Sequence, residues 1–198
     1  MIALCATVFV ATHVAADELD RYQAETVPVA PKAVVAVQEV RPVENLVETI
    51  IETYPVPLDE ELQLFIVQEC EKVNIAPEVI FAVIQKESSF RADVVGDNGK
   101  SFGLCQIQKQ WHEDRMDKLG VDDLLDPYQN IMVAIDYLAE LVNRYEDIDM
   151  ALMAYNAGAS GANKHWWSKG IYTNDYSQEV REISDSIAKG MVVNVLYG

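Results

Sequence analysis

From residue 58 onward, apolar residues recur with the three-to-four-residue period of amphipathic helices. The helices predicted from this pattern cover residues 58–73, 77–88, 127–145, 150–156 and 174–188. Residues 89–105 are instead rich in Gly, Asp and Asn, which favours a loop or a small hairpin. We therefore expect a mostly α-helical domain over residues 58–198, with a minor loop or hairpin element.

The chain before residue 58 has a different pattern. Residues 1–16 form an apolar run that ends in small residues, as a secretory signal peptide does, although it lacks a basic start. We therefore expect an exported protein; a frayed apolar N-terminus is the alternative. Residues 17–57 are rich in Pro, Val and Glu without a steady period, which predicts a linker. Within this segment, residues 44–53 have the pattern of a short amphipathic helix.

The charge of the chain limits its partners. Its 32 acidic and 15 basic residues give a net charge of −17. Nucleic acids and anionic membrane surfaces repel such a chain. We therefore expect no nucleic-acid binding. We also expect no stable membrane insertion once the signal segment is removed.

The cysteines bear on metal binding and on redox state. Cys5, Cys70 and Cys105 form no metal-ligand spacing with the three histidines, so we predict no metal site. We also expect no other cofactor. In an exported protein, a disulfide between Cys70 and Cys105 is one expectation. Two free buried thiols are the other, and the sequence favours neither.

Glu87 is the residue that first points to chemistry. It continues the apolar stripe of Ile80, Val83 and Ile84 on the helix predicted at 77–88. Burial and the negative end of the helix dipole both disfavour its charged form, so we expect a raised pKa. A carboxyl group that holds its proton near neutral pH can act as a general acid. The alternative is a helix-end Glu that reaches water or pairs with a Lys or Arg.

Two further motifs follow Glu87-Ser88 in order, namely Gly103-Leu104-Cys105-Gln106 and Ala154-Tyr155-Asn156. Together they resemble the catalytic domain of soluble lytic murein transglycosylases, in which Glu-Ser, Gly-Leu-Met-Gln and Ala-Tyr-Asn occur in this order. The resemblance covers roughly residues 62–188 and implies a lysozyme-like helical fold. Cys105 stands where the family has Met, and we expect this change to alter packing or saccharide contact and to leave the acid unaffected.

The resemblance implies cleavage of the β-1,4 bond between N-acetylmuramic acid and N-acetylglucosamine, so the implied partner is the glycan strand of peptidoglycan. Glu87 would protonate the leaving oxygen and then accept the proton of the muramic acid C6 hydroxyl, which attacks C1 and gives a 1,6-anhydro end. The substrate-binding residues that the resemblance implies are Ser88, Ser101, Gly103, Leu104, Cys105, Gln106, Tyr155, Asn156 and Tyr176. We also expect one of the adjacent Trp166 and Trp167 to be exposed for stacking on sugar.

Three other functions compete with this interpretation. A hydrolytic muramidase on the same fold would need a second carboxylate to guide water, and Asp93 and Asp97 are the candidates. A glycan-binding module without activity would not need Glu87, and a helical scaffold protein would leave the three motifs unexplained. Single site residues also have simpler explanations: the hydroxyl of Ser88 can satisfy a backbone carbonyl, and Tyr155 can be a core aromatic residue.

Overall fold

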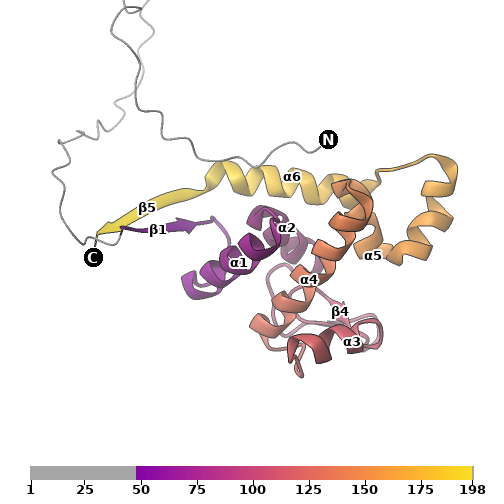
Figure 1. Cartoon of the computed structure of the whole chain (residues 1–198), viewed down its shortest axis with the longest axis horizontal. Helices are drawn as coiled ribbons and strands as arrows, with labels where there is room; N and C mark the ends of the chain where they lie inside the picture. Colours follow the sequence, from indigo (N-terminus) through magenta and orange to yellow (C-terminus); the bar gives the residue numbers. More distant parts are fainter. Residues whose placement is uncertain (1–47, 198) are drawn as a thin grey trace, which may run out of the picture. The chain divides into compact units, whose positions relative to one another are not determined.

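The structure, a computed structural model, describes residues 48–197, with the side chains of residues 53–192 (Figure 1). The predicted signal segment at 1–16 and residues 17–47 of the predicted linker lie outside this part. In chain order, the elements are β1 (Glu48–Thr53), α1 (Glu60–Val73), α2 (Pro77–Ser88), β2 (Val95–Gly96), β3 (Ser101–Phe102), β4 (Ile107–Gln108), α3 (Lys109–Leu119), α4 (Pro127–Tyr145), α5 (Ile148–His165), the 3-10 helix η1 (Trp167–Lys169), α6 (Asp175–Gly190) and β5 (Val192–Tyr197). None of the helices within residues 48–197 has both the length and the apolar character needed to cross a membrane.

Helices α1, α4, α5 and α6 begin where a short polar side chain caps them. The Asp59 carboxylate accepts a hydrogen bond from the N–H of Leu62 and so starts α1. Asp126 caps α4 in the same way, with Pro127 in the first helical position. Asn174 and Ser177 form a reciprocal capping box at the start of α6. The mostly helical fold predicted from sequence is confirmed, and α5 continues past residue 156 across a kink at Gly158.

The core is centred on α2, which packs against α6, and on α4, which packs against α1 and α5 (Figure 1). The middle of α2 is buried on all sides rather than on one stripe, and its fully buried residues include Phe81, Val83 and Ile84. Because the buried middle of this helix and its packing on α6 fix the helix, its last turn, which contains Glu87, has a fixed position.

A small antiparallel sheet occupies the region predicted to be a loop or hairpin. Its strand order is β2-β3-β4, with Val95 opposite Phe102 and Ser101 opposite Gln108. The turn between β3 and β4 therefore contains the motif Gly103–Gln106.

The short helix predicted at residues 44–53 was wrong for residues 48–53, which form β1. This strand pairs antiparallel with β5, with Glu48 opposite Tyr197 and Thr53 opposite Val192. The segment is rich in β-branched residues, which favour strands. The spacing of apolar residues favoured a helix. A strand forms instead because the segment pairs with β5, which is far away in the sequence.

The predicted linker 17–57 also extends too far, because Tyr54 belongs to the core. Its side chain is 5% exposed, and its ring centroid lies 4.8 Å from that of Phe81. The Tyr54 N–H donates to the Gln63 side chain at 2.9 Å, and the amide of Gln63 donates to the carbonyl of Leu58 at 2.9 Å. The helical domain therefore includes residues before 58.

We expect Tyr54→Ala to lower the free energy of unfolding by about 3 to 5 kcal/mol, because it removes a buried aromatic ring. Tyr54→Phe keeps the ring and should lose less. Urea denaturation of the full chain measures both changes. If Tyr54→Ala were as stable as the parent, the domain would begin at residue 58 as the sequence pattern predicted.

Candidate active site

Glu87 lies in the last turn of α2, facing α6. The Tyr176 hydroxyl donates a hydrogen bond to Glu87 Oε1 at 2.6 Å. Burial raises the pKa of the Glu87 carboxyl above its ordinary value, and the charge of Asp97 adds to this. The Tyr176 hydrogen bond and the charge of Lys86 act in the opposite direction, but the net change is a rise. The pKa direction expected from the apolar stripe thus agrees with the structure.

The alternative explanation of Glu87, an ion pair at a helix end, does not match its contacts. Lys86, the adjacent cation, pairs with Glu179 on α6 instead. Among the side chains of residues 53–192, no Lys, Arg or His forms an ion pair with Glu87. The partner of Glu87 is therefore a neutral phenol, which leaves the carboxyl able to hold its proton.

Tyr176 is the residue that orients this carboxyl. It lies in the first turn of α6, between the capping-box residues Asn174 and Ser177, and its side chain is 9% exposed. Burial and the nearby Glu87 charge raise the pKa of Tyr176 well above its ordinary value. The hydroxyl consequently keeps its proton and acts as a donor.

The chain turns sharply directly after Glu87-Ser88. Ser89 and Phe90 both have left-handed backbone angles, with φ of 53° and 63°. Two such residues in succession, neither of them Gly, are uncommon and are often found beside functional sites. The Ser88 hydroxyl donates to the carbonyl of Ile84 at 3.1 Å, and the side chain of Ser88 is 2% exposed. Ser88 thus has the simpler role considered from the sequence, in which its hydroxyl satisfies a backbone carbonyl.

The motif Gly103–Gln106 forms a tight turn for which Gly103 is required. Its φ is +71°, and a Cβ there would lie 2.4 Å from the carbonyl oxygen of Leu124 and 2.5 Å from Asn130 Nδ2. The amide of Gln106 donates to the carbonyls of Val94 at 3.1 Å and Gly103 at 2.9 Å. Gln106 thus braces the turn with its side-chain N–H groups.

Asn130, on α4, holds the same turn and was missed by the sequence analysis. Its side chain is fully buried; Nδ2 donates to the carbonyls of Phe102 and Leu124, each at 2.8 Å. Its Oδ1 accepts from the Cys105 N–H at 2.8 Å. A polar side chain next to the apolar stripe of α4 was the signal that could have identified Asn130. A polar residue on the apolar stripe of α2 identified Glu87 in a similar way.

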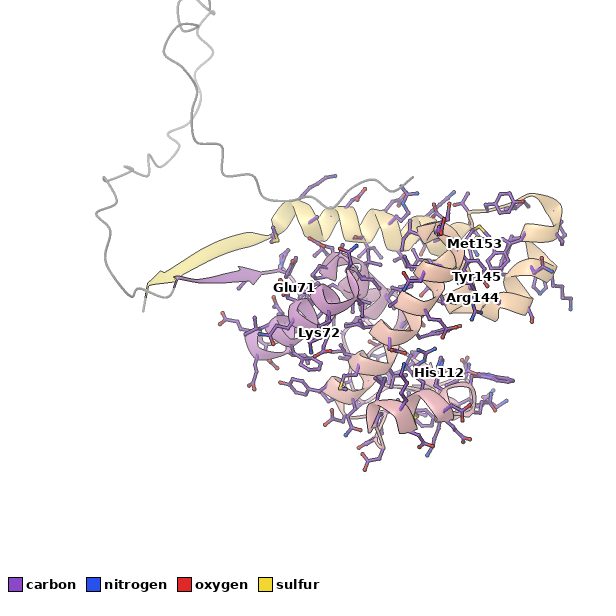
Figure 2. All side chains as sticks on the ribbon, in the orientation of Figure 1. Glu71, Lys72, His112, Arg144, Tyr145 and Met153 are labelled. Carbon is purple, nitrogen blue, oxygen red and sulfur yellow. The ribbon has the colours of Figure 1, made fainter. Side chains whose placement is uncertain are left out.

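Tyr155 holds the turn from a third side, because its hydroxyl donates to the carbonyl of Cys105 at 3.0 Å. Its ring centroid lies 5.4 Å from that of Tyr137, which packs edge-on against His112 at 4.6 Å. His112, labelled in Figure 2, lies on α3. Burial, with a smaller effect of the Arg115 charge, lowers the pKa of His112 to about 4, so this aromatic stack is neutral at pH 7.

The two described cysteines are free thiols, so the disulfide expectation is wrong and the thiol expectation is confirmed. Both are buried, and burial raises their pKa values, that of Cys70 to about 12. The side chain of Cys105 is 1% exposed, as is that of Leu104. Both side chains pack in the core, so they shape the turn from behind.

The remaining predicted residues differ in exposure. Asn156 is exposed on α5, whereas Ser101 is buried and its hydroxyl donates to Asp97. Asp97 also accepts from Gln108 Nε2 at 3.1 Å. Of the two loop carboxylates, Asp97 is the one whose charge acts on the Glu87 pKa.

The expectation of one exposed Trp at 166–167 was wrong. Trp166 and Trp167 are both half-buried, and the ring of Trp167 packs on Tyr145 at 4.8 Å. The exposed Trp is instead Trp111 on α3, at 75%. Within the described side chains, His, Cys, Asp and Glu form no cluster able to hold a metal ion.

We expect Asn130→Ala to lower the free energy of unfolding by about 2 to 4 kcal/mol, because three buried backbone groups lose their partner. Activity should fall further than stability explains, since the Gly103–Gln106 turn is released. Gln129→Ala is the matched control on α4: it removes only surface hydrogen bonds to the N–H groups of residues 122 and 123 and should cost less than about 1 kcal/mol. Equal stabilities of the two variants, measured by urea denaturation, would contradict the role of Asn130.

Comparison with known proteins gives one family. The family model described as the transglycosylase SLT domain matches residues 64–177. The transglycosylase of Enterobacteria phage PRD1 is 34% identical over 125 residues, which are 63% of this chain and 40% of that protein. Invasion protein IagB of Salmonella typhimurium is 32% identical over 99 residues, which are 46% of this chain and 61% of that protein. The chain thus spans between two fifths and about three fifths of these relatives.

A solved structure agrees with the fold. An inactive mutant of the lytic transglycosylase Slt from Pseudomonas aeruginosa superposes with a TM-score of 0.51 at 23% identity, over 65% of this chain and 24% of that one. This likeness shows the fold, and the family match covers all of the motifs that contain Glu87, Gln106 and Tyr155. The chain belongs to the transglycosylase SLT domain family.

Proposed function

We propose that this protein is a lytic transglycosylase that cleaves the β-1,4 bond between N-acetylmuramic acid and N-acetylglucosamine in peptidoglycan. The observation that carries the proposal is the environment of Glu87. Its carboxyl group has a raised pKa, a neutral phenol as its partner and no ion pair with a described cation. Such a group can enter the reaction as an acid at neutral pH.

In the proposed reaction, Glu87 donates its proton to the glycosidic oxygen as the bond from this oxygen to C1 breaks. Positive charge then develops on the muramic acid ring. The C6 hydroxyl of the same ring attacks C1, and its proton passes to the Glu87 carboxylate. The acid is restored and no water is consumed, which gives a 1,6-anhydro end.

Tyr176 supports both halves of this cycle. Its hydrogen bond orients the carboxyl, and it favours the charged carboxylate that exists after proton donation. The opposing effects of burial and hydrogen bonding keep the Glu87 pKa raised without preventing ionisation. A group that must donate and then accept one proton needs this balance.

The turn Gly103–Gln106 is proposed to place the sugar. Asn130 and Tyr155 fix its backbone from within the core, and Gln106 fixes it from its own side. A rigid turn suits an intramolecular attack, which requires orientation of the C6 hydroxyl more than activation of it. We assign Asn156, which is exposed one residue after Tyr155, to direct contact with the glycan.

A hydrolytic muramidase is the second candidate, and Asp97 is the observation in its favour. Ser101 and Gln108 hold its carboxylate, and its charge influences Glu87. A carboxylate so placed can guide water to C1. The two candidates differ in their product.

Export is part of the proposal, since peptidoglycan lies outside the cytoplasm. It rests on the signal-like residues 1–16, followed by a linker from residue 17 towards β1. We propose glycan strands of peptidoglycan as the partner of the catalytic domain.

We expect Glu87→Gln to keep its fold and to reduce peptidoglycan cleavage by roughly 10²–10⁴-fold, because acid–base assistance is lost. The parent rate should fall as pH rises through the raised pKa of Glu87, since the acid must begin protonated. Substantial turnover by a folded Glu87→Gln protein would contradict the assignment.

Tyr176→Phe is the matched variant for this measurement. It removes the hydroxyl, whose hydrogen bond lowers the Glu87 pKa, and retains the ring. The pKa should therefore rise further, and the falling limb of the pH–rate profile should move to higher pH. An unshifted limb would show that another group controls it.

The two candidate reactions are separated by mass spectrometry of the cleaved glycan. We expect 1,6-anhydro-muropeptides, which are lighter by one water than the hydrolysis products. Asp97→Asn should retain most activity, whereas Asn156→Ala should reduce it. Reducing N-acetylmuramic acid ends, together with loss of activity in Asp97→Asn, would place the protein among the hydrolases.

A further inference from the structure

Trp111 is the most exposed of the large hydrophobic residues in the described part of the chain. Its side chain is 75% exposed, whereas the others of this group range from 38% to 53%. Trp is usually well buried, because it has the largest apolar surface to remove from water. Trp111 gains no such burial, although it lies in the first turn of the regular helix α3.

The ring of Trp111 is nevertheless held in place. Its indole N–H donates to Gln108 Oε1 at 3.2 Å, and Gln108 Nε2 donates to Asp97 Oδ2 at 3.1 Å and to Ser101 Oγ at 3.2 Å. The ring is thus tethered by its polar edge and remains open to solvent. An oriented ring binds a flat ligand with less loss of conformational entropy than a free one does.

The tether connects Trp111 to the proposed catalytic site. Gln108 is the last residue of β4, the strand that follows the Gly103–Gln106 turn. Gln108 pairs with Ser101 on β3. Asp97, at the other end of the tether, is the carboxylate whose charge acts on Glu87. Trp111, on α3, is therefore linked by hydrogen bonds to the small sheet that contains the Gly103–Gln106 turn.

The surroundings of Trp111 indicate the class of ligand. Its sequence neighbours Lys109, Gln110, Glu113 and Asp114 are exposed and polar. A protein or membrane partner would need a contiguous apolar patch, which one ring among polar side chains does not supply. A pyranose ring has an apolar C–H face that matches one indole, and hydroxyls at its edge that match polar neighbours.

We propose that Trp111 forms a saccharide-stacking subsite that binds an N-acetylhexosamine ring of the glycan strand beyond the two sugars at the cleaved bond. This inference rests on the proposed function, since the ligand is a distal part of the same substrate. Trp111 contributes affinity for long strands and takes no part in bond cleavage.

The test uses the full chain with Glu87→Gln, which should bind glycan without cleaving it. The probes are β-1,4-linked N-acetylglucosamine oligosaccharides of increasing length, and calorimetry measures their affinity. Adding Trp111→Ala should weaken binding of the longer oligosaccharides by about tenfold, the scale of one aromatic contact. The shortest oligosaccharide that binds should be unaffected.

Three further variants separate stacking from other causes. Trp111→Phe keeps an aromatic face and should restore most of the affinity. Gln108→Ala frees the ring and should weaken binding of the longer oligosaccharides by a smaller factor than Trp111→Ala. Leu64→Ala removes a 38% exposed apolar side chain on α1 and should change nothing. In the active enzyme, Trp111→Ala should raise KM for glycan strands with kcat unchanged.

The outcomes distinguish the two levels of the proposal. Equal affinities with and without Trp111→Ala at every length, or an equal loss at every length, would overturn the stacking subsite alone. If the Glu87→Gln protein bound no oligosaccharide and the parent cleaved no peptidoglycan, the proposed function would fail, and the subsite with it.

Discussion

Much of the structure depends on one constraint, the burial of a carboxyl group at the end of an enclosed helix. Glu87 holds a raised pKa because it is buried where α2 packs against α6, and its partner there, Tyr176, is neutral. This requires α2 and α6 to pack in one register, which the capping box of α6 helps to fix by setting where that helix begins. The proposed chemistry is thus a consequence of helix packing: a looser junction would admit water and return the carboxyl to its ordinary pKa.

Local signals predicted α1, α2, α4 and α6 well, but they missed α3 and most of α5. They predicted the contacts between distant segments poorly. The helix from Pro77 to Ser88 and the Asp126-Pro127 start of α4 follow from capping and periodicity, which act within a few residues. β1 was misassigned because its partner β5 lies about 140 residues away, as the pairing of Thr53 with Val192 shows. Glu87 was found because a charged residue interrupts an apolar stripe, whereas the role of Asn130 depends on backbone groups of a loop far away in the sequence.

The residues of the turn between β3 and β4 affect a ligand indirectly, through the backbone path of the turn. Of its residues, Leu104 and Cys105 point into the core, and Gly103 leaves room for the Asn130 amide. Their importance for a ligand therefore lies in the backbone path that they allow. Cys105, where related domains have Met, fits this account, because a buried side chain of the turn can change in size if its neighbours adjust.

The pairing of β1 with β5 brings the two ends of the described chain side by side (Figure 1). Glu48 lies opposite Tyr197 at the outer end of this ribbon, and Thr53 lies opposite Val192 nearer the helices. A pulling force applied through segments attached at residues 48 and 197 would open the ribbon one residue pair at a time, as a zipper opens. The backbone hydrogen bonds of the ribbon would thus break before the force acted on Tyr54 and the helices that hold Glu87.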